Sequence, residues 1–380
     1  MSFFLSISLA RALTLDEAVL RAAEVDPNAV VAELTWRQAR LDATEAWAGL
    51  GVTPSVSASR RFAAGTVADV NSVSLGIGVL DPPAWLGAAR ESAQARGARQ
   101  VSDATSLDAQ YAAATLFYEA LAAEAARAAA KEGERFAHAT AEATAARVAA
   151  GLESELAGRS ARLGLLQAQA DTAQAEADVA ISRARLGRAL QQDIDALTPA
   201  AALPVTDEAG RSPWLDVAAT ELDVAKLEHA EAIAALFPTG SIRADSSFAT
   251  LNEWALTLGM TWQFDGVIGP FARARSAAIE QEIATVELDA AERDYVLLAR
   301  IAAEQARAAR RVAEAARARE ELANESLGVG QARLSVGLAS SLEVLRLQDE
   351  AANARADRVR SELAEATATL DARRVAGTRW

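Results

Sequence analysis

The chain has 380 residues, a formal net charge of −14 and no cysteine, and aromatic residues make up only 5% of it. The negative charge argues against a nucleic-acid partner, because phosphate binding needs a concentrated positive field. The lack of cysteine excludes disulfides, thiolate metal sites and cysteine nucleophiles. A chain so poor in large side chains must pack thin elements closely, and long helices with alanine seams meet that need.

The N-terminal segment 1–12 has some features of a signal-peptide remnant. Residues 3–9 are apolar, and Ala10-Arg11-Ala12 has the A-x-A form that signal peptidase cleaves. No positive charge precedes this short apolar run. A signal-peptide remnant and an ordinary N-terminal segment therefore fit these residues equally well. No run of 18 apolar residues occurs elsewhere, so any membrane span must be built from strands.

The first predicted strands form a β-hairpin over about 55–80. Val73, Leu75, Ile77 and Val79 alternate with serine and glycine, the period-two pattern of a transmembrane strand with one face toward lipid. Residues 55–62 are the predicted partner strand, with a loop near 63–70. Arg60 falls on the side of that strand that carries the apolar residues. It therefore lies at an interface, or the predicted strand register is in error.

Two tracts without proline, 84–198 and 271–380, are rich in strong helix formers and are predicted as helical hairpins over about 84–198 and about 271–375. Apolar residues recur there at alternating spacings of four and three, which indicates coiled-coil packing. The predicted seams are Leu107, Tyr111, Ala114, Tyr118 and Leu121; Leu163, Leu166, Ala170, Ala173, Ala177, Ala180 and Ala184; and Leu345, Asp349, Ala352, Ala356, Val359, Leu363, Ala366 and Leu370.

A second β-hairpin is predicted over about 241–264. Its second strand alternates Trp254, Leu256, Leu258, Met260 and Trp262 with small or polar residues, so these five are predicted to face lipid. Trp254 and Trp262 would lie about 26 Å apart along an ideal strand and form two aromatic girdles. A soluble sheet would show the same alternation, but two isolated hairpins between such long helices have nothing soluble to pack on.

The order of elements occurs twice. Residues 146–156 align with 332–342 at a constant offset of 186, as for Gly151 and Gly337. The first repeat is predicted over 13–198 as a helix, a β-hairpin and a helical hairpin, and 199–213 links it to a second such repeat over 214–380. Four strands cannot close a barrel, and lipid does not tolerate an open edge, so an oligomer is required without its number being fixed.

The sequence resembles the TolC-like outer-membrane efflux proteins over nearly its whole length. The matching segments are Leu13 to Ala18 with Asp26-Pro27, Thr53 to Val56, Trp262 to Gly266, and Val336 to Leu345. The resemblance implies a mainly α fold with a small transmembrane β component. It also implies a homotrimer whose twelve-stranded barrel lies in the outer membrane of a Gram-negative bacterium and whose helical barrel crosses the periplasm.

The sequence shows no metal-ligand spacing and no catalytic constellation, so we expect a chain that is not an enzyme and needs no cofactor or metal. By the same resemblance, it passively conducts small molecules, such as drugs, metals or metabolites, from a periplasmic adaptor and an inner-membrane pump to the exterior. The adaptor-contact tips would be Gly151, Leu152, Val336, Gly337 and Leu338. Residues at the aperture, with a role in selectivity, would be Glu343, Arg346, Glu153 and Glu155.

At the aperture the sequence departs from the family pattern. Arg346 reverses the second acid of the family's D-V-L-D motif, and Leu334 stands where some members carry a gating tyrosine. No nucleophile with a base and no phosphate loop is found. Both histidines, His138 and His229, fit solvated helix positions. The alternative functions are a soluble coiled-coil scaffold and an amphipathic protein that coats lipid or polymer granules.

Overall fold

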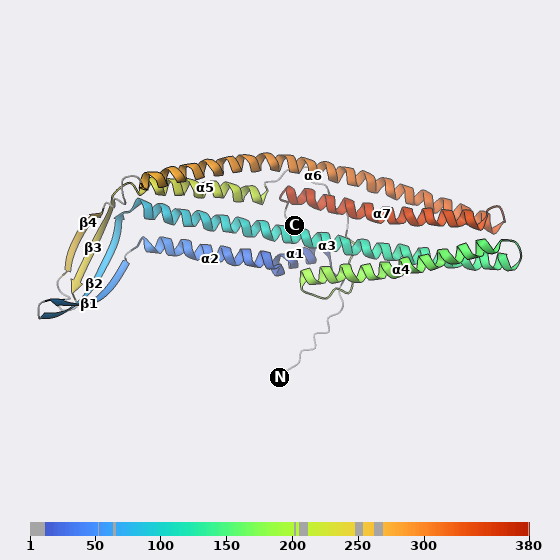
Figure 1. The fold of residues 1–380 in the computed structure, drawn as a ribbon, viewed down its shortest axis with the longest axis horizontal. Coiled ribbons are helices and arrows are strands. Elements are labelled where there is room, and N and C mark those ends of the chain that lie inside the picture. The colour runs from blue at the N-terminus through green and yellow to red at the C-terminus, as the bar shows by residue number, and fades with distance from the viewer. Residues whose placement is uncertain are drawn as a thin grey trace, which may run out of the picture. The chain divides into compact units, whose positions relative to one another are not determined.

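The computed structural model describes residues 12–51, 53–63, 66–200, 203–204, 212–247, 254–261, 269–378 and 380. The chain is mainly helical with one four-stranded antiparallel sheet, and Figure 1 shows its elements in chain order. It divides into two compact units. Unit 1 comprises Met1–Ala29, Ser106–Gly210 and Val296–Trp380, and unit 2 comprises Val30–Thr105 and Arg211–Tyr295. Each unit takes segments from both predicted repeats.

The long helices α3 (Pro82–Ala149) and α6 (Gly269–Ser335) each have many residues in both units. Both prolines that precede the predicted helical tract lie in the first turn of α3, where the missing N–H has no intrahelical acceptor to lose. None of the helices within the described residues is both long and apolar enough to cross a bilayer.

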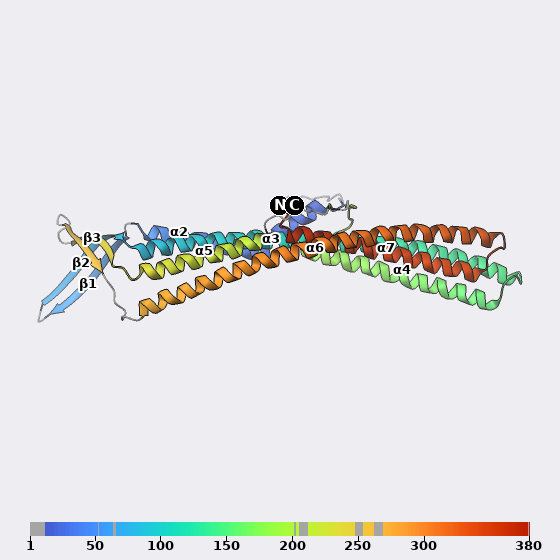
Figure 2. The same cartoon turned by 90° about the horizontal axis from the view of Figure 1, so that it is seen from above.

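Unit 1 also contains α1 (Leu15–Val25), α4 (Glu155–Leu190) and α7 (Ser341–Val375). In Figures 1 and 2, α4 runs beside the later part of α3 and α7 runs beside the later part of α6. The main core cluster joins α1, α3, α4 and α7 and includes Ala18, Val19, Tyr111, Ala114, Phe117, Leu186, Leu190 and Leu370. Alanine at many of these positions lets the helix axes approach closely.

The predicted seams are buried on α3 and exposed on α4 within the single chain. Leu107, Tyr111 and Ala114 are buried, and Tyr118 and Leu121 pack partly buried against the same cluster. On α4 the predicted seam from Leu163 to Ala184 is solvent-exposed in the single chain. The side of α4 that the chain itself buries carries Ala157, Ala161, Thr172, Ala175, Val179, Leu186 and Leu190. On α7 the seam is mixed, with Val359 and Leu370 buried and Asp349 exposed.

The duplication is visible in the helix lengths. α3 and α6 have 68 and 67 residues, and α4 and α7 have 36 and 35. α4 ends at Leu190 rather than near 198, because Gln191 adopts a left-handed backbone (φ 52°) that a helix cannot continue. The segment that follows runs past Leu13 in a parallel bridge to Leu197.

Unit 2 contains α2 (Pro27–Gly49), α5 (Pro213–Ala234) and the sheet, together with the early parts of α3 and α6. The Trp47 Nε1 donates to Ser92 Oγ (2.8 Å) and joins α2 to α3. Arg90 of α3 pairs with Glu228 and Glu231 of α5 at 3.9 and 3.7 Å. These contacts hold the helix ends that carry the sheet.

The strands are β1 (Thr53–Ala63), β2 (Thr66–Leu80), β3 (Thr239–Ser247) and β4 (Trp254–Thr261), hydrogen-bonded in that order. The loop predicted near 63–70 is wrong. The pairing of β1 with β2 continues as far as Ala63 opposite Thr66. Backbone pairing between the two strands therefore extends beyond the apolar part of β2. Arg60 stands opposite Asp69 in this register. Residues 262–264 of the predicted fourth strand lie outside the described residues.

The register aligns apolar residues across three strands. Leu75 pairs with Ala244, which pairs with Leu256, and Ile77, Ile242 and Leu258 form the next row of the same face. On the other face of the sheet, one row is formed by Gly76, Arg243 and Thr257. One face of the sheet is therefore apolar and the other small or polar, as the alternation predicts.

Candidate functional site: the paired helical turns

The two turns that join α3 to α4 and α6 to α7 have the same backbone geometry. The amides of Gly151 and Leu152 donate to Val148 O (2.9 Å) and Arg147 O (2.8 Å). In the second turn, the amides of Gly337 and Leu338 donate to Leu334 O (3.0 Å) and Arg333 O (2.8 Å). This is the Schellman arrangement, and it needs a left-handed residue. Both glycines supply one, with φ of 71° and 78°.

Each turn is followed by a serine that starts the next helix. The Ser154 hydroxyl accepts from the Ala157 amide (3.3 Å), and the Ser340 hydroxyl accepts from the Glu343 amide (3.2 Å). These N-caps satisfy amides that would otherwise lack acceptors and fix where α4 and α7 begin. The chain therefore builds two equivalent rigid hairpins.

Both turns present apolar side chains to solvent. Leu152 and Leu338 are each 70% exposed and Val336 is 68% exposed. Leu156 and Leu342, in the first turns of α4 and α7, are exposed as well. Such large aliphatic groups at the end of a hairpin offer a contact for a partner helix. The residues predicted as adaptor contacts thus lie together at one end of unit 1, where Figures 1 and 2 show both turns.

Glu153 ties the first turn to the second hairpin. Its side chain is only 10% exposed and forms an ion pair with Arg147 Nε at 3.0 Å. The Ser341 hydroxyl donates to Glu153 Oε1, which links the first turn to the first residue of α7. Arg147 Nη1 also donates to Leu334 O (3.4 Å), near the end of α6. Glu153 is therefore an internal crosslink and not a solvated charge.

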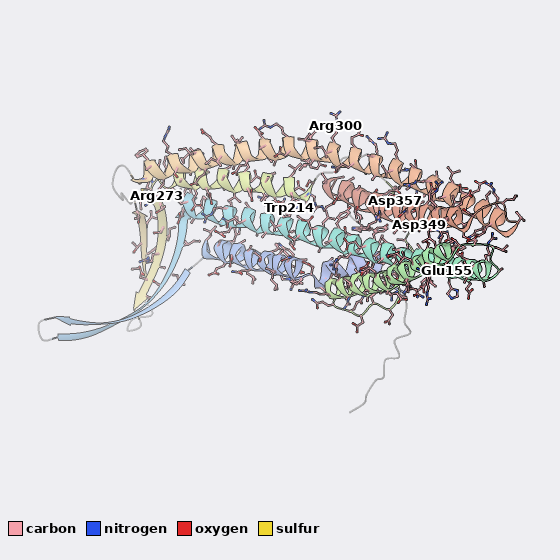
Figure 3. All side chains as sticks on the ribbon, turned by 45° about the vertical axis from the view of Figure 1, so that its right-hand side comes forward. Glu155, Trp214, Arg273, Arg300, Asp349 and Asp357 are labelled. Carbon is pink, nitrogen blue, oxygen red and sulfur yellow. The ribbon has the colours of Figure 1, made fainter. Side chains whose placement is uncertain are left out.

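The other predicted aperture residues are exposed. Glu155, at the start of α4 (Figure 3), pairs with Arg159 of the next turn at 3.4 Å, and both side chains are highly exposed. Glu343 lies 4.0 Å from Arg333 Nη1. Arg346 lines a groove of about 890 Å³ between α7 and the pair α3 and α4, whose lining also includes Asp349 and Asp171. The four predicted residues thus have different surroundings.

Sequence reasoning did not find Arg147, Ser341 or the role of Arg333. An available signal was that Arg147 and Arg333 occupy equivalent positions in the aligned repeats, one turn before each glycine. Each of the two arginines pairs with an acid near its own turn, Glu153 and Glu343 respectively. Ser341 could not be found in this way, because its partner belongs to the other repeat.

A second polar cluster joins α3, α6 and α7 farther along unit 1. The buried Arg355 Nη2 donates to Asn324 Oδ1 (2.6 Å), and the guanidinium lies over the Phe136 ring at 5.6 Å. Glu320 and Glu132 lie 3.8 and 3.7 Å from it. A charge buried in this way persists only when paired, so the cluster fixes how α7 sits against α3 and α6.

The residues predicted to face lipid form the apolar face of the sheet where side chains are described. Leu256, Leu258 and Met260 are 77 to 82% exposed, and Leu75 and Ile77 are exposed on the same face. Val73, Val79 and Trp254 keep the predicted strand positions, and Trp262 lies outside the described residues. Within the described residues no group of three histidine or acidic side chains is placed to hold a metal ion.

Comparison by sequence finds no match, neither to a family model nor to a curated protein. Comparison of structures finds strong matches. A membrane protein from Pseudomonas aeruginosa has a TM-score of 0.83 at 18% identity, covering 96% of this chain and 90% of that one. The outer membrane protein VceC from Vibrio cholerae has a TM-score of 0.81 at 14% identity, with 96% of each chain covered.

The open state of the MtrE outer membrane channel from Neisseria gonorrhoeae has a TM-score of 0.80 at 19% identity, covering 96% of this chain and 88% of that one. Each of these alignments covers 96% of this chain, so each extends over both units. The chain therefore has the TolC-like fold that these bacterial outer-membrane proteins share.

Proposed function

We propose that this chain is one protomer of a homotrimeric outer-membrane channel with no chemistry of its own. It conducts small molecules passively to the exterior of a Gram-negative cell, and an inner-membrane pump delivers them through a periplasmic adaptor. The observation that carries the proposal is the four-stranded sheet with one strongly exposed apolar face, on a fold matched by known outer-membrane channels.

The sheet supports membrane insertion by several copies. β1 and β4 each have one partner among the described strands, so both outer edges carry unpaired backbone groups. Such edges are unfavourable in lipid, whereas pairing β4 of one copy with β1 of the next closes a barrel. Three copies give twelve strands, the number that the resemblance implies.

The exposed side of α4 supports the same assembly. Leu163, Leu166 and Ile181 are exposed and lie among alanines on the side that the chain does not bury. A heptad stripe without an intrachain partner fits coiled-coil packing against a second copy. The predicted seam on α4, which is exposed within the chain, is thus proposed as a contact of the trimer.

The tips support docking to an adaptor and a gate that opens by movement of helices. Leu152, Val336 and Leu338 are the proposed contacts, held by Gly151 and Gly337. The crosslink from Glu153 to Ser341 joins the two hairpins, so opening requires this pair to separate or the hairpins to move as one body. Glu343 and Arg346, with Glu155, are proposed to set a weak charge preference at the mouth.

Electron microscopy and conductance of the detergent-extracted protein test this proposal. We expect a tube with threefold symmetry, heat-modifiable migration on gels and channels in planar bilayers. A monomer that stays in solution without detergent would overturn the proposal and favour the coiled-coil scaffold.

Export in cells tests the tips separately. Leu338→Asp should abolish export while trimers still form, because a charge replaces the apolar contact. The matched variant Leu152→Asp reports whether the first tip contributes equally. Normal export with Leu338→Asp would refute the assignment of the second tip as an adaptor contact.

A further inference from the structure

A cavity of about 510 Å³ lies in unit 1 between α3, α7 and the segment that follows α4. Each of these elements contributes aliphatic side chains to its lining, among them Leu121 of α3, Leu203 of the segment and Leu363 of α7. The volume is that of sites for drug-sized molecules, which are mostly apolar with a few polar groups that orient the ligand. The described residues of the lining include none from the paired turns or the sheet, so the cavity is a separate candidate site.

The walls of this cavity are held in place by the chain itself. The Leu13 amide donates to Ala196 O and the Thr198 amide donates to Leu13 O, both at 2.9 Å, which fixes the segment where it enters the lining. Leu203 and Leu121 both pack against the main core cluster. A ligand therefore meets walls that are already formed and loses little affinity to ordering them.

Carboxylates supply most of the charge in the lining. Glu124 belongs to α3, Glu362 and Glu365 belong to α7, and Arg317 of α6 is the base among the described lining residues. The Arg317 Nε and Nη2 donate to Glu362 Oε1 (2.8 Å) and Glu365 Oε2 (2.9 Å), so this guanidinium is already shared between two acids. An anionic ligand would face three carboxylates and would have to compete for the arginine. The lining therefore disfavours an anion.

Two of these glutamates keep one oxygen free. Arg183 directs both Nε and Nη2 to Glu124 Oε1, at 3.0 and 2.5 Å, so Glu124 Oε2 accepts no hydrogen bond from a described residue. The same holds for Glu365 Oε1, because Arg317 binds the other oxygen. Both glutamate side chains are largely buried, with 22 and 16% of their surface exposed. A carboxylate oxygen with so little access to water gains from a donor that a ligand brings.

Glu362 differs from the other two glutamates. Its Oε1 accepts from Arg317, and its Oε2 accepts from Arg358 Nη1 (2.8 Å). Each of the three acids thus has an arginine partner, and the cavity is not a bare acidic cluster. The two free oxygens, rather than net charge, decide which polar group the cavity accepts.

We propose that this cavity binds a small amphiphilic amine. The apolar body of the ligand packs against Leu121, Leu203 and Leu363, and its ammonium group donates to the free oxygens of Glu124 and Glu365. An ammonium group carries donors and no acceptor, which matches a lining whose unused groups are acceptors. The inference goes beyond the proposed function. It does not depend on the number of copies, because every described lining residue belongs to unit 1 of one chain.

A ligand in this cavity contacts α3 of the first helical hairpin and α7 of the second. Because the cavity exists only while these helices are packed together, a bound amine stabilises that arrangement by mass action. The amine should therefore raise the midpoint of thermal unfolding as its concentration rises above the dissociation constant.

The test compares three probes that share one ring system and differ in their polar group: naphthylmethylamine, naphthylmethanol and naphthoate. Equilibrium dialysis of the detergent-purified protein, with equal detergent on both sides, measures the binding of each probe. Glu124→Gln/Glu365→Gln removes the two charges at nearly constant size. Ala366→Phe fills the cavity without changing its charge.

Each variant has a matched control. Glu304→Gln/Glu314→Gln removes two exposed glutamates of α6 that pair with arginines outside the cavity. Ala364→Phe adds the same ring at an exposed position of α7 that is not part of the lining. Thermal unfolding shows that each variant is folded, and Ala366→Phe still tests the site if the glutamine variant does not fold.

We expect one saturable site per chain for the amine, which binds about tenfold more tightly than the alcohol, and none for naphthoate. Glu124→Gln/Glu365→Gln should weaken the amine about tenfold, to the level of the alcohol. Ala366→Phe should abolish binding of both, and the controls should match the parent. Equal affinities of amine and alcohol for the parent protein would overturn the assignment of an amine. Unchanged binding by Ala366→Phe would overturn the cavity as the site.

These outcomes separate the inference from the proposed function. A protein that binds the amine at one site but forms no channel refutes the proposed function alone. A channel that conducts normally but shows no saturable binding of the amine refutes the inference alone.

Discussion

Glu153, in the turn between α3 and α4, accepts a hydrogen bond from the hydroxyl of Ser341, the first residue of α7 and 188 residues away in the chain. The same carboxylate pairs with Arg147. A single side chain that is only 10% exposed thus joins the two hairpins. The two hairpins of one protomer should therefore move together, and their separation should be controlled at this pair.

We predict that Glu153→Ala raises the open fraction of the channel in planar bilayers. Removing the carboxylate leaves Arg147 and Ser341 without their partner and removes the contact between the first turn and α7. Glu155→Ala is the matched control, because the ion pair of that side chain with Arg159 is exposed on the surface. Equal conductance of parent and Glu153→Ala channels would show that the pair does not restrain the tips.

Gly337→Ala should destabilise the protein by about 1 kcal/mol, because an L side chain is strained at a φ of 78°. Gly328→Ala, in the interior of α6 with open space around its Cβ position, should stabilise it by a similar amount, about 1 kcal/mol. Thermal unfolding of the solubilised protein measures both. Two substitutions with the same sign would contradict the assigned turn.

Arg355→Ala should destabilise the protein by about 2 to 3 kcal/mol. The substitution removes the hydrogen bond to Asn324 and the ion pair with Glu320. Because Glu132 is exposed, the expected loss of stability lies at or below the lower end of the range for breaking a buried ion pair.

The control for this prediction is Arg360→Ala. Its ion pair with Asp357 (3.0 Å) is exposed, so its removal should cost less than about 0.5 kcal/mol. Chemical denaturation followed by circular dichroism compares the two variants. A loss as small for Arg355→Ala as for Arg360→Ala would show that the buried cluster does not fix α7.

Tyr111→Phe should lower stability by about 1 kcal/mol at neutral pH, because the phenol donates to Thr378 O at 2.7 Å. The ring contact with Trp380, at 5.6 Å between centroids, should persist. Thermal unfolding at neutral pH measures the difference, and an unchanged midpoint would show that the hydrogen bond contributes nothing net.

Alkaline pH provides a second readout of Tyr111. Burial raises the pKa of Tyr111 above its ordinary value near 10, so the folded state holds this proton more tightly than the unfolded state. This contribution to stability is complete below pH about 10 and is lost as pH rises through the folded pKa. Tyr111→Phe should therefore lose less stability than the parent above pH about 10, and parallel losses would contradict the assignment.

Local chemistry determined much of this molecule. The absence of proline from 84–198 and the excess of helix formers predicted long helices, and α3 and α6 confirm them. The alternation around Leu75 and Leu256 predicted strands with one apolar face, because side chains in a strand point alternately to its two sides. The repeat predicted two glycine turns of equal geometry, and a Schellman turn needs only a few adjacent residues.

Tertiary structure alone decided which partner covers each face. A heptad stripe marks an apolar side of a helix but not what lies against it, so the sequence did not show that the chain itself leaves the seam from Leu163 on α4 exposed. The partners of Glu153 and the burial of Arg355 depend on how distant hairpins pack, which no local pattern encodes.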